Sequence, residues 1–587
     1  MNDPRRSFRY ILAFAGLLTA LYAVTGLLGL AISLTALRDN VLSSTDDNRV
    51  RASLYLAELI VGLPVWLALW IASQRRVESS DEERDSAARR VFLGTTFAFT
   101  SVVALFALHS VLRYVFTLPG TSDIDPTAQN AVFSVARLFV FGAAWLYHAR
   151  IGWTERGPQE DDEAHDVAVS VLAGFSLMFL AIGAVQALGE SLGNLISSGQ
   201  PVFSGVLPRS IWDRWGAIAA WILSGGFVWA AIWQYELSRG GARRVRVAYL
   251  WIVLLFAAPT ALWSAATMLY ELLRRGLGYD PRAESTWQFL VSVLPILLVS
   301  GVVWAHHWAV VRDQPSPRSE GERHMPGAIL WPRRLPVAVL VALGLSMVTV
   351  AIVAVLWLSL DFVLNTGNSL SGGAWWRDRL SGSIGAGLVG LPAWLGGWNL
   401  LQRAAASAPQ RERGASERRR LLGFIVLSGL LAAIGFGISL LWLVLQALLG
   451  AGLDGGEVSR MLKSLSAILV ALSMVAYHGQ TLRRDLAFGP ALGTSVRISA
   501  FVAPGSEVLL AQLRESTGHR IKVVGFLSDV PRDARHDRTE LEKQLASLSA
   551  PGSFRAERAL ILLGPNGGSI HAYSHQRPVQ ATDMGAD

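Results

Sequence analysis

Twelve long apolar stretches, separated by short polar connections, fill residues 8–480 of the chain. Each stretch holds about 20 residues or more, which is the length that an α-helix needs to cross the hydrocarbon core of a bilayer. The pattern predicts twelve membrane-spanning helices, over residues 8–37, 54–73, 91–116, 130–149, 167–193, 215–236, 246–273, 285–310, 335–363, 381–402, 420–449 and 461–480.

One aromatic pattern recurs three times along these stretches. Two tryptophans four residues apart mark the end of one helix, and a histidine marks the end of a helix about one hairpin later. The first tryptophans are 163 and 165 residues apart, and the histidines are 159 and 171 residues apart. This spacing predicts three tandem four-helix units, over residues 1–165, 166–330 and 331–484. The three sets are Trp66, Trp70 and His148; Trp229, Trp233 and His307; and Trp394, Trp398 and His478.

The closest internal match joins the first and third units. Segments Val61–Trp70 and Val389–Trp398 are identical at seven of ten positions. Pro64 and Pro392 fall at the same place in the two segments, where each removes a backbone hydrogen bond and is expected to kink its helix. The recurring histidines are expected at the membrane interface, where amphipathic rings are favoured, and the tryptophan pairs either at the interface or in helix packing.

A change of character after the last apolar stretch predicts a small soluble domain over residues 494–579. Strands are expected over 496–502, 521–527, 559–563 and 569–573, and helices over 506–517 and 539–548. The glycine-rich turn at 564–568 joins two strands and does not open a helix, so it is typical of a hairpin and not of a phosphate-binding loop. This domain could bind a cytoplasmic protein partner. Residues 580–587 are expected to be a disordered tail.

The distribution of arginine predicts the orientation. The connection between the second and third helices carries five arginines, whereas residues 117–130 carry no lysine or arginine. By the positive-inside rule, both termini are cytoplasmic and the protein spans the cytoplasmic (inner) membrane. Arg274, Arg275 and Arg282 fall on the predicted outer side and are the exception. The first apolar run is too long for a cleavable signal peptide and is expected to remain as the first helix.

The composition supports an integral membrane protein. The mean hydropathy is +0.39, 52% of residues are hydrophobic and 16% are charged. The net charge of +8 comes from arginines scattered over short loops, which argues against nucleic acid and leaves membrane lipids as the expected partners. The fold class is therefore an all-α integral membrane protein with about twelve transmembrane helices in three tandem units, plus a small carboxy-terminal cytoplasmic α/β domain.

Catalytic chemistry is not indicated. The chain has no cysteine, which excludes disulfides, thiolate catalysis and cysteine-ligated metals. It shows no HExxH motif, no paired carboxylates and no nucleophile arrangement, so neither an enzyme nor a cofactor is expected. The recurring histidines could hold a metal or haem only if a central axis brought them together. No metal site is therefore assigned.

Four ionisable residues inside the first unit are the candidate site. Such residues are costly in a membrane and need a partner or a function. Glu58 and Arg137 each lie eight residues before a marker tryptophan and are expected at similar depth. His109 and Arg113 are spaced to share one helix face. The residues could form an interhelical ion pair, or a positive pocket for an anionic ligand or lipid head group.

The arginine-rich hairpins that end in Trp-x-x-x-Trp, alternating with hairpins that end in Tyr/His-His, resemble an uncharacterised bacterial membrane family. That family is known as a four-helix domain of unknown function that often occurs in tandem. The resemblance covers residues 1 to about 484 and implies no activity, cofactor or site.

Two classes of function remain. Few intramembrane charges, and almost wholly apolar second and third units, favour a membrane scaffold or sensor with a cytoplasmic α/β module. A secondary transporter, or a protein that binds lipid or anions, is the alternative. Against transport, no inverted repeat and no pair of interrupted helices with a polar midplane site is visible.

Overall fold

The computed structural model describes the long helices and part of the carboxy-terminal region. The described residues are 4–36, 45–84, 86–117, 126–155, 163–196, 211–238, 244–278, 288–313, 331–364, 375–407, 409–449, 455–488, 497–502, 521–526, 558–564 and 567–573, with a few single residues between 513 and 543.

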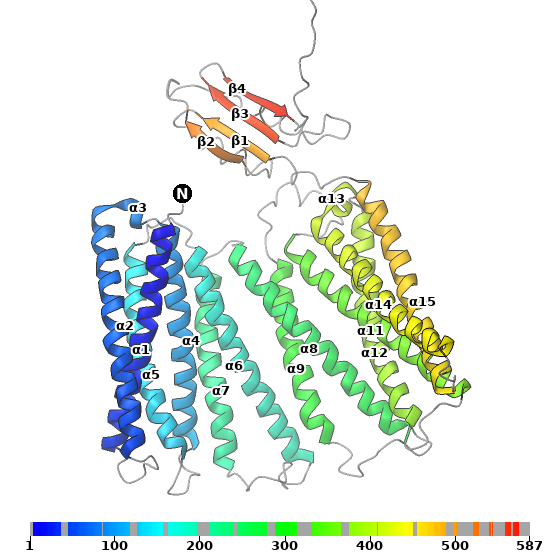
Figure 1. The fold of residues 1–587 in the computed structure, drawn as a ribbon, viewed down its shortest axis with the longest axis horizontal. Coiled ribbons are helices and arrows are strands. Elements are labelled where there is room, and N and C mark those ends of the chain that lie inside the picture. The colour runs from blue at the N-terminus through cyan, green and yellow to red at the C-terminus, as the bar shows by residue number, and fades with distance from the viewer. Residues whose placement is uncertain are drawn as a thin grey trace, which may run out of the picture. The chain divides into compact units, whose positions relative to one another are not determined.

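Twelve helices among the described residues are long and apolar enough to cross a membrane. The protein is therefore a multi-pass membrane protein with a helical membrane part (Figure 1). The helices are α1 (Pro4–Ala36), α2 (Thr45–Ser79), α4 (Ala87–Thr117), α5 (Pro126–Glu155), α6 (Glu163–Ile196), α7 (Ile211–Ser238), α8 (Arg244–Gly276), α9 (Gln288–Asp313), α11 (Trp331–Val363), α12 (Trp375–Ser407), α14 (Ser416–Leu448) and α15 (Gly455–Leu486), with short helices α3 (Asp81–Arg84) and α13 (Pro409–Gly414).

All twelve expected helices are present, but most are longer than predicted. The helix predicted over 54–73, for example, runs as α2 from Thr45 to Ser79. Hydrophobicity marks only the part of a helix inside the hydrocarbon, whereas backbone hydrogen bonding continues into the polar interface. Polar and charged side chains of the outer turns are therefore part of rigid helices and not of loops.

The first and last groups of four helices share one packing arrangement. In the first group, α1 packs against both α2 and α5, and α4 packs against α5. In the last group, α11 packs against both α12 and α15, and α14 packs against α15. This repeated helical architecture agrees with the internal repeat expected from the aromatic pattern.

Glycines at equivalent positions allow close helix contact in both groups. A Cβ atom added to Gly16 of α1 would lie 2.9 Å from the backbone nitrogen of Trp66, and one added to Gly344 of α11 would lie 2.4 Å from that of Trp394. Helices approach this closely only where a side chain is missing. The first hairpin of each group is therefore fixed by the same glycine contact.

The contacts divide the chain into two compact parts. One comprises residues 1–271 and 280–311, and the other comprises residues 272–279 and 312–587. In the first part, α4 packs against both α6 and α7, so helices of the first and second expected units share one body. The unit boundaries at 165, 330 and 484 stay predictions.

The carboxy-terminal region contains a four-stranded sheet. Its strands are β1 (Arg497–Val502), β2 (Ile521–Phe526), β3 (Arg558–Gly564) and β4 (Gly567–Tyr573), in the order β2-β1-β3-β4. β1 is parallel to β2 and β3, whereas β3 and β4 form an antiparallel hairpin. The two helices expected in this domain lie largely outside the described residues, as does the tail 580–587. The α/β domain as a whole therefore stays a prediction.

Candidate functional site: a repeated cluster of arginine, carboxylate and histidine

The recurring tryptophans and histidines pack against one another inside the helix groups. In the first group, the ring centroids of Trp70 and His148 are 5.4 Å apart, and Trp70 Nε1 donates to the Tyr147 hydroxyl at 2.8 Å. In the last group, the Trp398 and His478 centroids are 5.1 Å apart, and Trp398 Nε1 donates to Tyr477 at 3.0 Å. The aromatic pattern in the sequence thus corresponds to a set of direct contacts.

All three recurring histidines are buried, with 2%, 1% and 2% of their surface exposed for His148, His307 and His478. Each Nδ1 lies 2.8 to 3.0 Å from the backbone oxygen four residues earlier. Because a carbonyl oxygen only accepts hydrogen bonds, Nδ1 must be the donor, which leaves Nε2 as an acceptor in the neutral ring. The three Nε2 atoms are buried without a hydrogen-bond partner among the described residues.

The middle group keeps the aromatic packing with different partners. Trp229 and Trp233 stack with centroids 5.4 Å apart, and Trp229 Nε1 donates to the Tyr249 hydroxyl at 3.3 Å. His306 takes the position that tyrosine occupies in the other two groups. Within the described part of the chain, no three histidine or acidic side chains gather in a way that could hold a metal ion.

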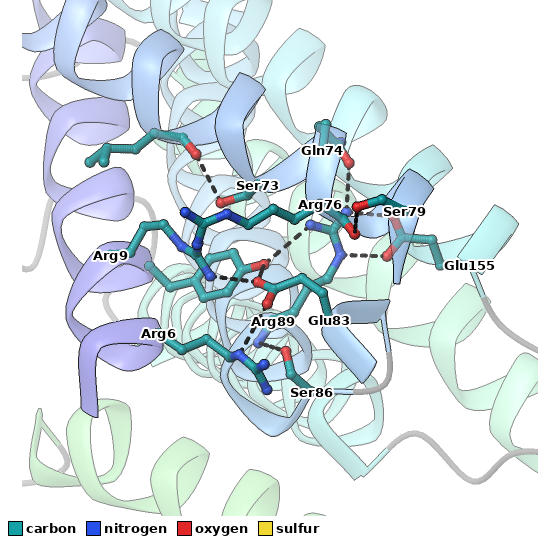
Figure 2. Close-up of polar contacts among 12 residues, drawn as sticks. Arg6, Arg9, Ser73, Gln74, Arg76, Ser79, Glu83, Ser86, Arg89 and Glu155 are labelled. Carbon is teal, nitrogen blue, oxygen red and sulfur yellow. Dashed lines mark hydrogen bonds and ion pairs between the residues drawn. The ribbon is translucent and has the colours of Figure 1, made fainter. Parts of the chain in front are cut away.

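A buried arginine lies on the tryptophan of the first group. Arg89 is 0% exposed, and its Nε and Nη2 donate to the two carboxylate oxygens of Glu155 at 2.7 and 2.5 Å (Figure 2). Nη2 also donates to Gln74 at 2.8 Å, and Nη1 donates to the Tyr10 hydroxyl at 3.4 Å. The guanidinium carbon is 5.2 Å from the ring centre of Trp70. Nearly every donor of this charge is therefore used inside the protein.

The short helix α3 contributes a second buried carboxylate to the same place. Glu83 is 4% exposed and accepts from Arg9 Nη2 at 2.7 Å and from the Tyr10 hydroxyl at 2.9 Å. Arg6 Nε lies 3.0 Å from its other oxygen. Figure 2 shows Arg6 and Arg9 approaching Glu83 from α1. Tyr10 thus joins Glu83 to Arg89. We call Arg6, Arg9, Tyr10, Gln74, Glu83, Arg89 and Glu155 the first polar cluster.

An equivalent cluster lies at the corresponding helix ends of the last group. Arg418 Nε donates to Asp485 at 2.6 Å, Nη2 donates to Gln402 at 3.2 Å, and Nη1 donates to the Leu401 carbonyl at 3.0 Å. The guanidinium carbon lies 5.8 Å from the ring centre of Trp398. The pair Arg418 and Asp485 is almost completely buried, at 4% and 1% exposed.

A second ion pair completes this arrangement. Arg334 Nη2 donates to Glu412 at 2.9 Å, and both residues are buried. We call Arg334, Gln402, Glu412, Arg418 and Asp485 the second polar cluster. Its members lie 328 to 330 residues after their counterparts in the first cluster, which are Arg6, Gln74, Glu83, Arg89 and Glu155 in the same order.

The middle group retains the arginine of this arrangement. Arg246 lies 5.9 Å from the ring centre of Trp233. It is the third residue of α8, just as Arg89 is the third residue of α4 and Arg418 the third residue of α14. All three groups therefore place a guanidinium over the second tryptophan of the repeated pair.

These clusters were missed at the sequence level, where the arginines were interpreted only as determinants of orientation. The signal was present, because arginine, glutamine and acidic residues recur with nearly the same step as the tryptophans. The arrangement links the start of the first helix, the connection after the second helix and the end of the fourth helix. Removing one partner would leave a buried charge uncompensated, so breaking these contacts between the segments is expected to be costly.

Of the four candidate residues inside the first unit, His109 has the best-defined surroundings. It is 6% exposed on α4, and its ring centroid lies 3.8 Å from that of Trp221 on α7 and 5.5 Å from that of Phe179 on α6. Arg113, one turn further along α4, is exposed. His109 therefore belongs to the contact between α4 and the next two helices.

The other two candidates are not joined by an ion pair. Glu58 is partly exposed on α2, and Arg137 is exposed on α5. Among the described residues, no ion pair or hydrogen bond connects Glu58 to Arg137 or to Arg113. Both the ion pair and the anion pocket stay predictions for these residues.

The second and third units are less apolar inside than expected. The spans contain the ion pair Glu190–Arg214, at 3.0 Å, and the contacts of Asp361 with Arg379 and Lys463. The expectation of almost wholly apolar units was wrong. The predicted helices already contained Glu190, Asp361 and Lys463, and their arginine partners Arg214 and Arg379 lie just before the helix starts that hydropathy gave.

Comparison with known proteins finds a similarity to one family model over two regions of the chain. The model of the domain of unknown function DUF5671 matches residues 6–120 and 334–478. The first match covers α1, α2 and α4, and the second runs from α11 to His478 on α15. No curated protein and no solved structure matches the chain. Over these two regions, the matches confirm the resemblance to an uncharacterised family with tandem copies, and they begin at the equivalent residues Arg6 and Arg334. The match does not include residues 121–333.

Proposed function

We propose that the protein is a membrane scaffold or sensor. In this proposal, the carboxy-terminal sheet is a cytoplasmic module that responds to changes in the packing of the membrane helices. The proposal includes the cytoplasmic membrane as its location, with both termini in the cytoplasm. It is supported chiefly by the junction at Asp485, where the last membrane helix ends and the path to the sheet begins.

Asp485 is fixed by two arginines at this junction. Its side chain accepts from Arg418 at 2.6 Å, and its backbone oxygen accepts from Arg419 Nη2 at 2.9 Å. Three residues later, the Phe488 ring lies 4.8 Å from the guanidinium carbon of Arg413. A change in the spacing of α14 and α15 would therefore move the start of the segment that leads to β1 at Arg497.

The position of the charged clusters favours this role over transport. The first and second polar clusters lie at helix ends, whereas transporters bind substrate near the bilayer midplane. A buried joint at the end of a helix transmits rigid-body movement, because breaking it costs more than moving with it.

Bilayers of different thickness provide the test. The full-length protein is placed in nanodiscs of short-chain and long-chain phosphatidylcholine, and hydrogen exchange is measured for residues 497–573. Exchange of the strands is expected to differ between the two bilayers in the wild type and to become independent of thickness in Asp485→Asn. Glu417→Gln, a change at a neighbouring acid, is the matched control and should respond like the wild type.

Two results would contradict the proposal. Strand exchange that is the same in both bilayers would exclude a sensor that works through the sheet. A thickness response that survives in Asp485→Asn would exclude the proposed junction. The orientation is tested separately by reporter fusions, which should report cytoplasm after Arg84, Arg243 and Arg411 and the outside after Asp123 and Gly373.

A further inference from the structure

A second charged site lies at the other end of α11, away from Arg334. Asp361 is 3% exposed, and its two carboxylate oxygens are held by different cations. Arg379 Nη1 of α12 donates to one oxygen at 2.9 Å. Lys463 Nζ of α15 donates to the other oxygen, which also receives the Ser459 hydroxyl at 3.4 Å. Three helices thus meet at one carboxylate.

The charges at this site do not balance. One carboxylate faces two cations, so the three side chains carry a surplus of one positive charge. Asp361 is enclosed, whereas the Arg379 side chain is 54% exposed and that of Lys463 is 21% exposed. Each cation makes one contact with Asp361 and keeps further N–H donors available. The negative partner is therefore inside and the unused donors face outward.

Aromatic rings border the site. The Arg379 guanidinium carbon lies 5.4 Å from the ring centre of Trp375, and that ring lies 5.4 Å from Phe362. Tryptophan near a helix end is favoured at the level of lipid head groups. The site thus combines a cationic surface with the ring type that marks the bilayer interface.

The equivalent position in the middle group shows what a balanced arrangement looks like. Arg214 lies 165 residues before Arg379, which is the step between the first tryptophans of these groups. It pairs with the single acid Glu190 at 3.0 Å. One arginine and one carboxylate leave no surplus there. The added cation, Lys463, is one of three lysines in the whole chain.

We propose that Arg379 and Lys463 bind the phosphate of an anionic phospholipid head group, with Asp361 holding the two cations in position. A phosphate oxygen bridging two cations would neutralise the surplus charge in a partly dehydrated place. The lipid is favoured over a free anion because the aromatic border and the membrane spans place the donors at head-group level. This assignment is independent of the proposed sensor role.

The test compares lipids that differ in charge. The full-length protein in neutral detergent is given phosphatidylglycerol or phosphatidylcholine, and retained lipid is counted by native mass spectrometry. The wild type is expected to retain phosphatidylglycerol in preference to phosphatidylcholine. Lys463→Met and Arg379→Gln should each reduce its apparent affinity about tenfold, equivalent to ~1.4 kcal/mol.

Two variants separate binding from folding. Arg460→Gln removes a cation from the same end of α15 whose side chain is 55% exposed, and it should leave lipid retention unchanged. Lys463→Arg keeps the charge and should keep the preference, so a loss seen only in Lys463→Met is not a general effect of altering α15.

Other outcomes would overturn the proposal. Equal retention of the two lipids by the wild type would exclude a charge-selective site. Preference for phosphatidylglycerol that persists in both Lys463→Met and Arg379→Gln would place the lipid elsewhere. If inorganic phosphate alone raises the melting temperature as much as phosphatidylglycerol does, the site binds a free anion and the lipid assignment is wrong.

Discussion

The first and second polar clusters share two arginines, a glutamine and two acids at matching positions, yet they differ in connectivity. In the first cluster, Tyr10 donates to Glu83 and accepts from Arg89, so that two acids and three arginines form one network. In the second cluster, the position of Tyr10 is taken by Ala338. Arg418 uses the Leu401 carbonyl where Arg89 uses the tyrosine hydroxyl.

This difference shows how one residue determines coupling in a buried polar cluster. Two ion pairs, Arg6–Glu83 and Arg89–Glu155, are kept in both copies. The Tyr10 hydroxyl that joins them is present in only one copy, as is Arg9, whose position is taken by Val337. The first cluster should therefore respond to mutation as a unit, and the second as two separate pairs.

The largest expected effect comes from removing the central arginine. Arg418→Met should cost about 3–5 kcal/mol, because it leaves Asp485 buried and unpaired. Arg89→Met should cost less, since the Glu155 side chain is 17% exposed and can be hydrated, against 2% for Asp485. Thermal unfolding in detergent measures both. The exposed neighbours Arg420→Met and Arg90→Met are controls, and equal losses for the two buried arginines would contradict the ranking.

The next effect tests whether the two groups pack equally tightly. Gly344→Ala should destabilise by about 1–3 kcal/mol, because its Cβ would meet the backbone of Trp394 at 2.4 Å. Gly16→Ala should cost less, since the corresponding approach is 2.9 Å. Gly396→Ala is the control, because an added Cβ there has no neighbour within 4 Å. The reverse order of the two losses would show that α1 and α2 are the tighter pair.

A smaller effect tests the tyrosine link directly. A double-mutant cycle with Glu83→Gln and Arg89→Met should give a coupling energy of about 1 kcal/mol in the native background and much less in Tyr10→Phe. The same cycle on Glu412 and Arg418 should give a value close to zero. Strong coupling in the second cluster would mean that another group replaces the tyrosine.

The smallest effect is expected for residues that share depth but no contact. A cycle on Glu58→Gln and Arg137→Leu should give a coupling energy within about 0.5 kcal/mol of zero, since no ion pair joins these side chains in the structure. A clearly larger value would support the ion pair that their positions in the sequence predict.

The contrast between Arg89 and Glu58 shows how far sequence reasoning reached. Helix number, order and the repeat were predictable because hydrophobic length and aromatic spacing are properties of the chain itself. The depth of Glu58 could be counted from Trp66 in the same way. The direction in which a helix faces its neighbours depends on tertiary packing. Residue spacing alone therefore could not identify which side chain contacts Glu58.

Arg89 illustrates the opposite failure. Its partner Glu155 is 66 residues away in sequence, and arginines near helix ends are ordinary topology signals. Only the repetition of the same residue types about 329 residues later indicated that Arg89 belongs to a buried cluster and is not simply a charged loop residue that sets orientation. Asp361 and Lys463 fall inside the expected helices 335–363 and 461–480, but Arg379 lies just before the expected start of its helix at 381. The contact among the three was therefore not anticipated.

The contact of α4 with α6 and α7 bears on how the protein is made. His109 faces Trp221, and a Cβ on Gly94 would lie 2.7 Å from the carbonyl oxygen of Ala164, so both positions are shaped for helices synthesised later. While the ribosome has released only the first four spans, α6 and α7 are not yet present to cover this surface of α4. The polar imidazole of His109 is then exposed to lipid. A chain stopped after α5 should therefore depend on an insertase or be degraded. A chain that reaches the end of α7 contains both helices that pack against α4.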